Sequence, residues 1–289
     1  MTLQAPMRCS SLAEQLDEPM IGSVEQRVRW LLVEDRSAWG EKAVRDVLGA
    51  SMEAEAKARG VRLLLVRRRE GDPAADAVRR VFLVDTATGR MAVRTVEHLA
   101  ELSAVEAAEA SVEDFGALMT DPILLVCTNG KRDACCALRG RALVTALAAD
   151  HAERTWECTH LGGHRFAGNL VCLPDGIVYG RVSPEDGPRL ADTYLERRLD
   201  PDLLRGRSAW APPAQVAEQA LRQALRIEGL DDVRLVEVSV TGDTAEVALA
   251  GPEGVARRFH LRAERAEPPR PISCRADELE SPLHWVLQA

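Results

Sequence analysis

Residues 122–198 alternate between apolar strand patterns and helix patterns in an order that few folds accommodate. Pro122–Val126 is wholly apolar and predicts a buried strand. Asp133 is a typical N-cap residue and predicts a helix over Ala134–His151. Thr155–Cys158 predicts a second, short strand. These elements form a strand–helix–strand unit, so we expect an α/β domain.

The same segment ends with a hairpin and a second helix. Phe166–Leu173 and Ile177–Val182 are strand patterns separated by Pro174-Asp175-Gly176, and Asp-Gly supplies the positive φ angles that a tight hairpin turn requires. Asp186–Arg198 then predicts a helix. This order of elements is that of the thioredoxin fold. We therefore expect a thioredoxin-like domain over residues 118–207.

Residues 1–117 predict a similar α/β unit. Its expected elements are strands at Val28–Glu34, Val61–Arg67, Arg80–Asp85 and Met91–Val93, helices at Lys42–Arg59 and Thr95–Leu102, and a turn at Gly71-Asp72-Pro73. Aligning Trp30-Leu-Leu-Val-Glu34 with Ile123-Leu-Leu-Val-Cys127 puts two strand-to-helix junctions in register, which indicates a degenerate duplication. The first copy would be a thioredoxin-like unit without a metal site, since Glu34 replaces Cys127. Chance similarity between two such units is the alternative.

Residues 208–289 predict a small α+β piece. A helix is expected at Gln215–Ile227, and strands at Val233–Val240, Thr244–Leu249 and Ala256–Ala263. Residues 269–289 show little pattern. Cys274 and His284 within them could be inert or could fold back toward the rest of the chain.

Charge and composition exclude several classes of function. The chain has 289 residues with 37 basic and 45 acidic side chains, and a net charge of −8 gives no electrostatic support for nucleic-acid binding. No apolar run reaches the ~18 residues of a spanning helix, so no membrane association is predicted. The N-terminal residues lack the apolar core of a signal peptide, which predicts a cytosolic protein. In a reducing cytosol, seven cysteines more often bind metal or perform redox chemistry than form disulfides.

Two clusters of metal-ligating residues lie close together in the central segment. The first is Cys127-Thr-Asn-Gly-Lys-Arg-Asp-Ala-Cys-Cys136, and the second is His160-Leu-Gly-Gly-His164. A cysteine at a strand end and another in the first turn of the next helix approach one point, where the helix N-terminus stabilises thiolates. Cys135 and Cys136 point about 100° apart on a helix, so only one of them would join Cys127 on one ion. Either one is possible from the spacing alone. Two histidines in a glycine-rich loop complete a mixed thiolate and imidazole ligand set.

These segments also resemble a known family. CTNGKRDACC…WECTHLGGHRFAGNLVCLPDG and RGRSAWAPPAQVAEQALR are similar to the sucrase/ferredoxin-like family of thioredoxin-like [2Fe–2S] proteins. The resemblance implies a [2Fe–2S] cluster with Cys127 and Cys136 on one iron and His160 and His164 on the other. It favours Cys136 over Cys135.

The function implied by the resemblance is electron transfer or redox sensing. Two neutral imidazoles in place of thiolates lower the negative charge of the centre, so its potential should be raised, and imidazole N–H groups open to water would couple it to proton loss. Redox protein partners are implied, namely a reductase donor and an unknown acceptor, and an electron carrier fits better than a self-contained enzyme. The alternatives are a structural zinc Cys₂His₂ site in a binding protein and a thiol redox protein. The oligomeric state is not predicted.

Several neighbours of the ligands are candidates for supporting roles. Lys131, Arg132 and Arg165 could dock an acidic partner or form a solvated surface. Asn169 and Thr159 could hydrogen-bond a sulfur or orient an imidazole.

Overall fold

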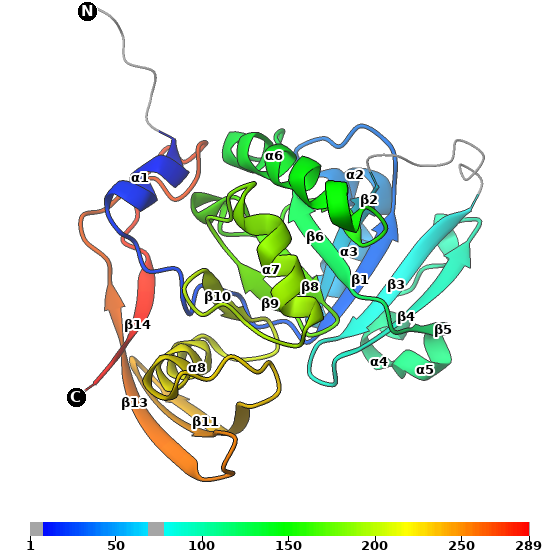
Figure 1. The fold of residues 1–289 in the computed structure, drawn as a ribbon. Helices are drawn as coiled ribbons and strands as arrows, with labels where there is room; N and C mark the ends of the chain where they lie inside the picture. The colour runs from blue at the N-terminus through cyan, green and yellow to red at the C-terminus, as the bar shows by residue number, and fades with distance from the viewer. Residues whose placement is uncertain (1–7, 69–77, 289) are drawn as a thin grey trace, which may run out of the picture.

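A computed structural model describes residues 8–68 and 78–288 of the chain, and the turn predicted at Gly71-Asp72-Pro73 lies outside them. Within these residues, ten strands form one mixed sheet in the order β10-β9-β8-β6-β7-β2-β1-β3-β4-β5 (Figure 1). The strands are β1 Arg29–Glu34, β2 Val61–Arg67, β3 Arg79–Asp85, β4 Arg90–Val96, β5 Ala117–Met119, β6 Ile123–Cys127, β7 Thr155–Cys158, β8 Leu170–Leu173, β9 Ile177–Tyr179 and β10 Leu204–Arg207. The predicted α/β class is confirmed.

The two halves of this sheet have the same strand order. β2-β1-β3-β4-β5 in one half corresponds to β7-β6-β8-β9-β10 in the other, with β1 parallel to β2 and β6 parallel to β7. The halves join where β2 pairs antiparallel with β7, through Val66 with Cys158 and Arg67 with Glu157. The boundary expected between residues 117 and 118 falls inside β5, and backbone hydrogen bonds connect the first two predicted units. Glu34 and Cys127 occupy equivalent strand ends.

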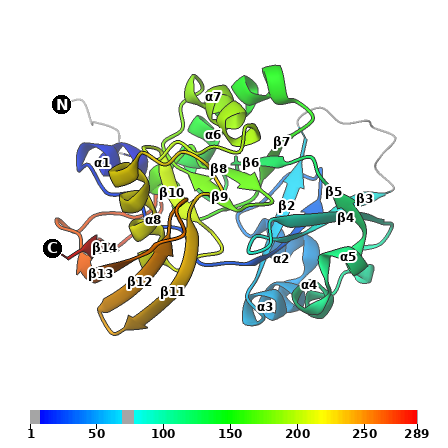
Figure 2. The ribbon, with the colours of Figure 1, turned by 60° about the horizontal axis from the view of Figure 1, so that its bottom comes forward.

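Helices cover the outer surfaces of both halves. Figure 2 shows α2–α5 beside β1–β5, and α6 and α7 beside β6–β9. These helices are α2 Ala43–Leu48, α3 Ala50–Ala58, α4 Ala104–Glu109, α5 Val112–Phe115, α6 Ala134–His151 and α7 Asp186–Leu195. The strands are apolar on both faces because a further core lies between the halves, where the Phe82 and Trp156 rings meet edge to face at 5.3 Å.

Two element predictions in the first half are wrong. The helix expected over Lys42–Arg59 is broken at Gly49, whose φ of 87° does not continue a helix. The helix expected over Thr95–Leu102 is absent from the described residues, because β4 continues to Val96 and only a 3₁₀ turn, Leu99–Glu101, follows. The short strand at Met91–Val93 is confirmed as part of β4.

The C-terminal part adds a second, four-stranded antiparallel sheet in the order β11-β12-β13-β14. Its strands are β11 Arg234–Thr241, β12 Thr244–Ala250, β13 Ala256–Arg265 and β14 Leu283–Leu287, the last of which was not predicted. Helix α8, Pro212–Leu225, contacts β10 on one side and β12 and β14 on the other (Figure 2). His284 lies in β14 opposite Glu264, whereas Cys274 folds back onto the start of α6.

The N-terminal helix α1, Cys9–Gln15, packs on the 3₁₀ turn η3, His164–Phe166. Figure 1 shows α1 next to the C-terminal segment that precedes β14, so the two ends of the described chain meet near α6. Among the described residues, no helix combines the length and apolar character needed to cross a membrane.

Candidate metal centre

Three of the four predicted ligands converge at the end of β6. The ligand atoms of Cys127, Cys136 and His160 all lie within 4.8 Å of one another. Cys127 ends β6, and Cys136 lies in the first turn of α6, which is capped by Asp133. Gly140 permits this approach, because a Cβ at that position would lie 2.2 Å from the carbonyl oxygen of Cys127.

The fourth predicted ligand, His164, lies against His160. Their rings stack with centroids 4.7 Å apart and an interplanar angle of 28°. Gly162 and Gly163 make the turn between them with φ angles of 83° and 63°, which favour glycine. The Nδ1 atoms of both histidines are buried and have no hydrogen-bond partner among the described residues. Because an unpaired buried polar atom is costly, these two nitrogens together with the two sulfurs fit a metal-ligating role.

The two thiols of this centre differ in their affinity for protons. A hydrogen bond from Cys136, with further ones from His160 and the Leu161 backbone, holds the pKa of Cys127 well below its ordinary value despite burial. The same hydrogen bond, together with burial, raises the pKa of Cys136. The two shifts run in opposite directions, so Cys127 is the more acidic thiol of the pair. Metal binding would require both thiols to lose their protons, since thiolates are the ligating form.

Burial and the neighbouring His160 lower the pKa of His164 to about 4. Its imidazole is therefore neutral near pH 7. A neutral ring has a free nitrogen lone pair, which is the form that binds metals.

Side chains from distant segments hold the histidine loop in place. Arg205 of β10 donates to the Asn169 side-chain oxygen at 2.7 Å, and Asn169 donates to the Gly163 carbonyl at 3.1 Å. Arg62 of β2 donates to the His160 carbonyl at 2.8 Å. The pattern of the sequence does not single out either arginine, because each acts through a contact made only in the folded chain.

Two of the predicted supporting residues contact the backbone near the centre. The Thr159 hydroxyl accepts from the backbone N–H of Leu65 at 3.1 Å, and Asn169 holds the loop between the two histidines through the Gly163 carbonyl. Arg165 donates to the buried Glu18 at 2.7 Å. Arg132 lies 3.4 Å from Glu41, and Lys131 is exposed.

Cys135 points to a different group of side chains. It lies 3.6 Å from Cys9 and 3.2 Å from Cys274, measured between sulfur atoms. Cys158 and Cys172 are fully buried in strands and belong to neither group. The geometry thus pairs Cys136 with Cys127.

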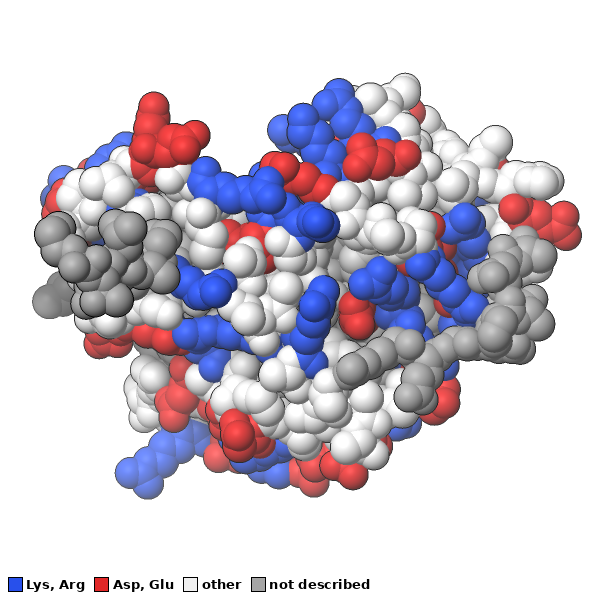
Figure 3. Space-filling model, turned by 90° about the horizontal axis from the view of Figure 1, so that it is seen from above, with Lys and Arg blue, Asp and Glu red and all other residues white. Residues whose placement is uncertain are grey.

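A pocket of about 550 Å³ opens beside His160. Basic side chains from several elements line it, with fewer acidic ones; the basic residues are Arg27, Lys42, Arg45, Lys57, Arg62 and Arg132. Figure 3 shows Lys and Arg side chains gathered across the middle of one face, with acidic side chains among them. The pocket gives solvent and small solutes a route to the His160 side of the centre.

Glu34, the counterpart of Cys127, makes ion pairs. Its carboxylate accepts from Arg80 Nε at 2.8 Å and from Arg36 at 3.3 Å. Burial acts to raise the pKa of Glu34, but the hydrogen bonds and charge of Arg80 outweigh it and hold that pKa below its ordinary value. The first half therefore carries an ion pair where the second half carries thiols.

Replacing Glu34 by glutamine is expected to lower the free energy of unfolding by about 1–2 kcal/mol at pH 7, a figure reduced for the partial exposure of Arg80. Because the folded-state pKa is depressed, this contribution is present above the unfolded-state pKa of ~4.3 and is lost as the pH falls through the folded-state value. Urea denaturation of the wild type and of Glu34→Gln, at pH values from 7 down into the acidic range, measures this contribution to the free energy of unfolding. The exposed Glu196→Gln is the control. A difference in the free energy of unfolding between the wild type and Glu34→Gln that grows as the pH falls would contradict the prediction.

A family model described as sucrase/ferredoxin-like matches residues 20–206, which is more than half of the chain. The chain belongs to the sucrase/ferredoxin-like family. The match includes all four predicted ligands of this sucrase/ferredoxin-like chain, together with Arg62 and Arg205. It ends at β10, so α8 and the four-stranded sheet lie beyond it.

Three curated relatives of this sucrase/ferredoxin-like chain share one name. "Altered inheritance of mitochondria protein 32" of Meyerozyma guilliermondii is 33% identical over 99 residues, covering 31% of the chain and 35% of the relative. The proteins of the same name from Eremothecium gossypii and Candida glabrata are 32% and 26% identical, covering 29% and 40% of the chain and 32% and 36% of the relatives. The chain thus spans about a third of the length of these relatives. No solved structure matches it.

The comparison corrects the function expected from the sequence. The relatives are named for altered inheritance of mitochondria, and their printed names describe no [2Fe–2S] electron carrier. The convergent cysteines and histidine could hold a metal ion, and they do not identify an iron–sulfur cluster. The expectation of an electron-transfer or redox-sensing protein is therefore wrong and is not retained.

Proposed function

We propose that the chain is a metal-binding protein whose centre is formed by Cys127, Cys136, His160 and His164. The observation that carries the proposal is the convergence of three donors within 4.8 Å from the end of β6, the start of α6 and the loop after β7. His164 supports it as the fourth donor, because its ring stacks on His160 and both Nδ1 atoms are buried without a partner among the described residues.

The cofactor proposed for this centre is a [2Fe–2S] cluster, on the family resemblance alone. Zinc is the competing outcome, since it takes the same cysteine and histidine ligands. The succession of β6, α6, β7, β8, β9 and α7 supports a thioredoxin-like arrangement for this half. No electron-transfer role is assigned to the centre.

A metal held by these donors would lie next to the junction between the two halves of the large sheet. All four donors belong to the second half, and the carbonyl of His160 accepts a hydrogen bond from Arg62 of the first half. Binding would therefore stabilise the junction between the halves, because a ligand that binds only the folded state adds to its stability. A cytosolic location and protein partners stay predictions.

The test is purification without oxygen, followed by analysis of iron, acid-labile sulfide and zinc per chain. One metal centre that is lost in the His160→Ala/His164→Ala double variant supports the proposal. Iron with an equal amount of sulfide that is lost in the double variant identifies the cluster, and zinc that is lost in the double variant without loss of sulfide identifies the alternative. Metal content that is unchanged in the double variant, or absent from the wild type after reconstitution with either metal, overturns the proposal.

A further inference from the structure

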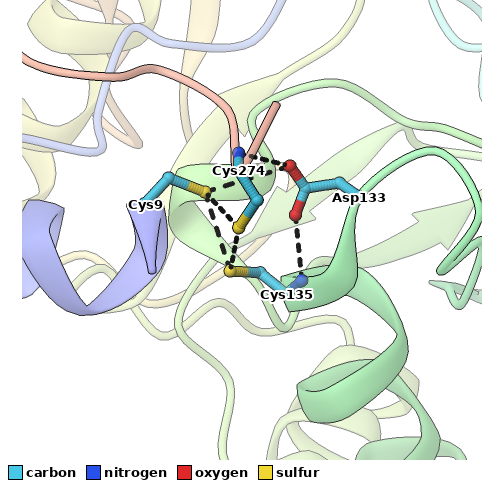
Figure 4. Close-up of side chains that lie close together, drawn as sticks. All are labelled: Cys9, Asp133, Cys135 and Cys274. Carbon is cyan, nitrogen blue, oxygen red and sulfur yellow. Dashed lines mark hydrogen bonds between the residues drawn. The ribbon is translucent and has the colours of Figure 1, made fainter. Parts of the chain in front are cut away.

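A second group of metal-ligating side chains lies beside the first and comes from three distant parts of the chain. Cys9 begins α1, Cys135 lies in the first turn of α6, and Cys274 belongs to the segment between β13 and β14. Asp133, the N-cap residue of α6, faces the three sulfurs (Figure 4). The ligand atoms of all four residues lie within 4.8 Å of one another.

The three sulfur atoms form a nearly equilateral triangle. Their separations are 3.2 Å for Cys135 and Cys274, 3.5 Å for Cys9 and Cys274, and 3.6 Å for Cys9 and Cys135. Three thiolates at 2.3 Å from a tetrahedral zinc ion would lie about 3.8 Å apart, whereas a disulfide bond joins two sulfurs at about 2.05 Å. The triangle is much closer to the zinc geometry, and a disulfide would use only two of the three.

Asp133 is held in a fixed orientation next to the sulfurs. Its Oδ1 accepts from the Cys135 backbone N–H at 2.9 Å, and its Oδ2 accepts from the Cys274 backbone N–H at 2.9 Å. The same Oδ2 lies 4.0 Å from the Cys9 sulfur. A carboxylate oxygen is a common zinc ligand, so Asp133 can supply the fourth donor with little rearrangement.

We propose that Cys9, Cys135, Cys274 and Asp133 form a second metal site that binds one zinc ion in tetrahedral coordination. Three soft thiolates with one carboxylate favour zinc over harder cations such as magnesium or calcium. Cys9 and Cys135 are buried, whereas Cys274 is exposed and leaves a path for the ion to enter. The N-terminus of α6 offsets part of the negative charge of the thiolates.

This zinc site would attach both ends of the described chain to the start of α6. Cys9 holds α1 there and Cys274 holds the C-terminal segment, next to Cys136 of the first centre. A buried ion-pair network supports the same arrangement, because Glu18 accepts from Arg165 at 2.7 Å and from Arg270 at 3.0 Å. Zinc binding would therefore help to hold the N- and C-terminal segments beside the loop that carries His164, which α1 contacts.

The test is zinc titration of the reduced 289-residue chain against a coloured chelator. Cys274→Ser is the main variant, because its exposed side chain makes misfolding an improbable cause of failure. It is expected to lower affinity at the second site by at least about 10–100-fold, and Asp133→Asn to weaken it less. Cys172→Ala, which removes a buried thiol outside both groups, should bind zinc as the wild type does. Zinc should also protect Cys274 from alkylation by iodoacetamide.

Two measurements distinguish metal binding at this site from metal binding at the first centre. In a Cys127→Ala background, zinc uptake that depends on Cys9 and Cys274 supports the second site even if the first centre takes no metal. Zinc uptake that is equal in the wild type and in Cys9→Ser and Cys274→Ser overturns it. A peptide map of the chain purified without oxygen that shows a disulfide between two of these three cysteines, reversed by a reductant, would also overturn it.

Discussion

Cys136→Ala is expected to release the metal of the Cys127–His164 centre, whereas Cys135→Ala is expected to leave that centre loaded. The two cysteines are adjacent in α6, but only Cys136 lies within 4.8 Å of the donors of Cys127 and His160. Removing a direct ligand should cost more than the roughly 10–100-fold loss of affinity seen when a group behind a ligand is removed. Metal content after desalting and titration of the remaining affinity measure the difference.

The adjacent pair is a matched control, since both side chains are buried and each variant removes one sulfur. Circular dichroism of the two variants should show the same secondary structure. Loss of the first centre's metal in Cys135→Ala, with retention in Cys136→Ala, would contradict the assignment. Cys135→Ala should instead lose zinc from the second site.

Glu218→Ala is expected to lower the free energy of unfolding by about 3–5 kcal/mol, the usual cost of removing one partner of a buried ion pair. The carboxylate oxygen of Glu218 accepts from Arg207 at 2.8 Å and from Arg222 at 2.9 Å. The side chains of Glu218 and Arg222 are both 0% exposed, so the variant leaves buried guanidinium charge without its counterion. Because Arg207 belongs to β10 and Arg222 to α8, the loss should loosen the contact between them.

Urea denaturation followed by tryptophan fluorescence measures this effect, and Trp210 near Arg207 reports on the α8 region. Glu237→Gln is the control, because its side chain is 64% exposed and lies 3.8 Å from Arg258. The control should change the free energy of unfolding by no more than about 0.5 kcal/mol. A Glu218→Ala chain as stable as this control would contradict the prediction.

The two proposed sites explain why α6 begins as it does. Asp133 caps the helix, Cys135 faces the chain termini, and Cys136 faces Cys127. Adjacent residues on a helix point about 100° apart, so the Cys-Cys pair can serve two different centres. Each cysteine of the pair then supplies a ligand to a different proposed site.

The fold of the central segment was largely predictable from local signals. The strands β6 and β7 and the helix α6 follow from short apolar runs, an N-cap aspartate and short turns. Two helix predictions failed. The helix expected over Lys42–Arg59 is broken at Gly49, which has a positive φ angle. The helix expected over Thr95–Leu102 is replaced at its start by β4, which pairs with β3 as far as Val96. Strand partners come from elsewhere in the chain, so local propensity does not determine where such elements end.

The sequence by itself indicated the candidate ligands of the first centre, because Cys127, the adjacent pair Cys135 and Cys136, and the two histidines His160 and His164 lie in two short clusters joined by one strand–helix–strand unit. The spacing alone left the choice between Cys135 and Cys136 open. Only the tertiary structure decided that Cys135 leaves this set and meets Cys9 and Cys274, two residues that are 265 positions apart. It also decided that both halves share one sheet and that Arg62 and Arg205 hold the histidine loop. The physical reason is that spacing along the chain predicts contacts within one or two elements, whereas contacts between distant segments arise from packing of the whole core.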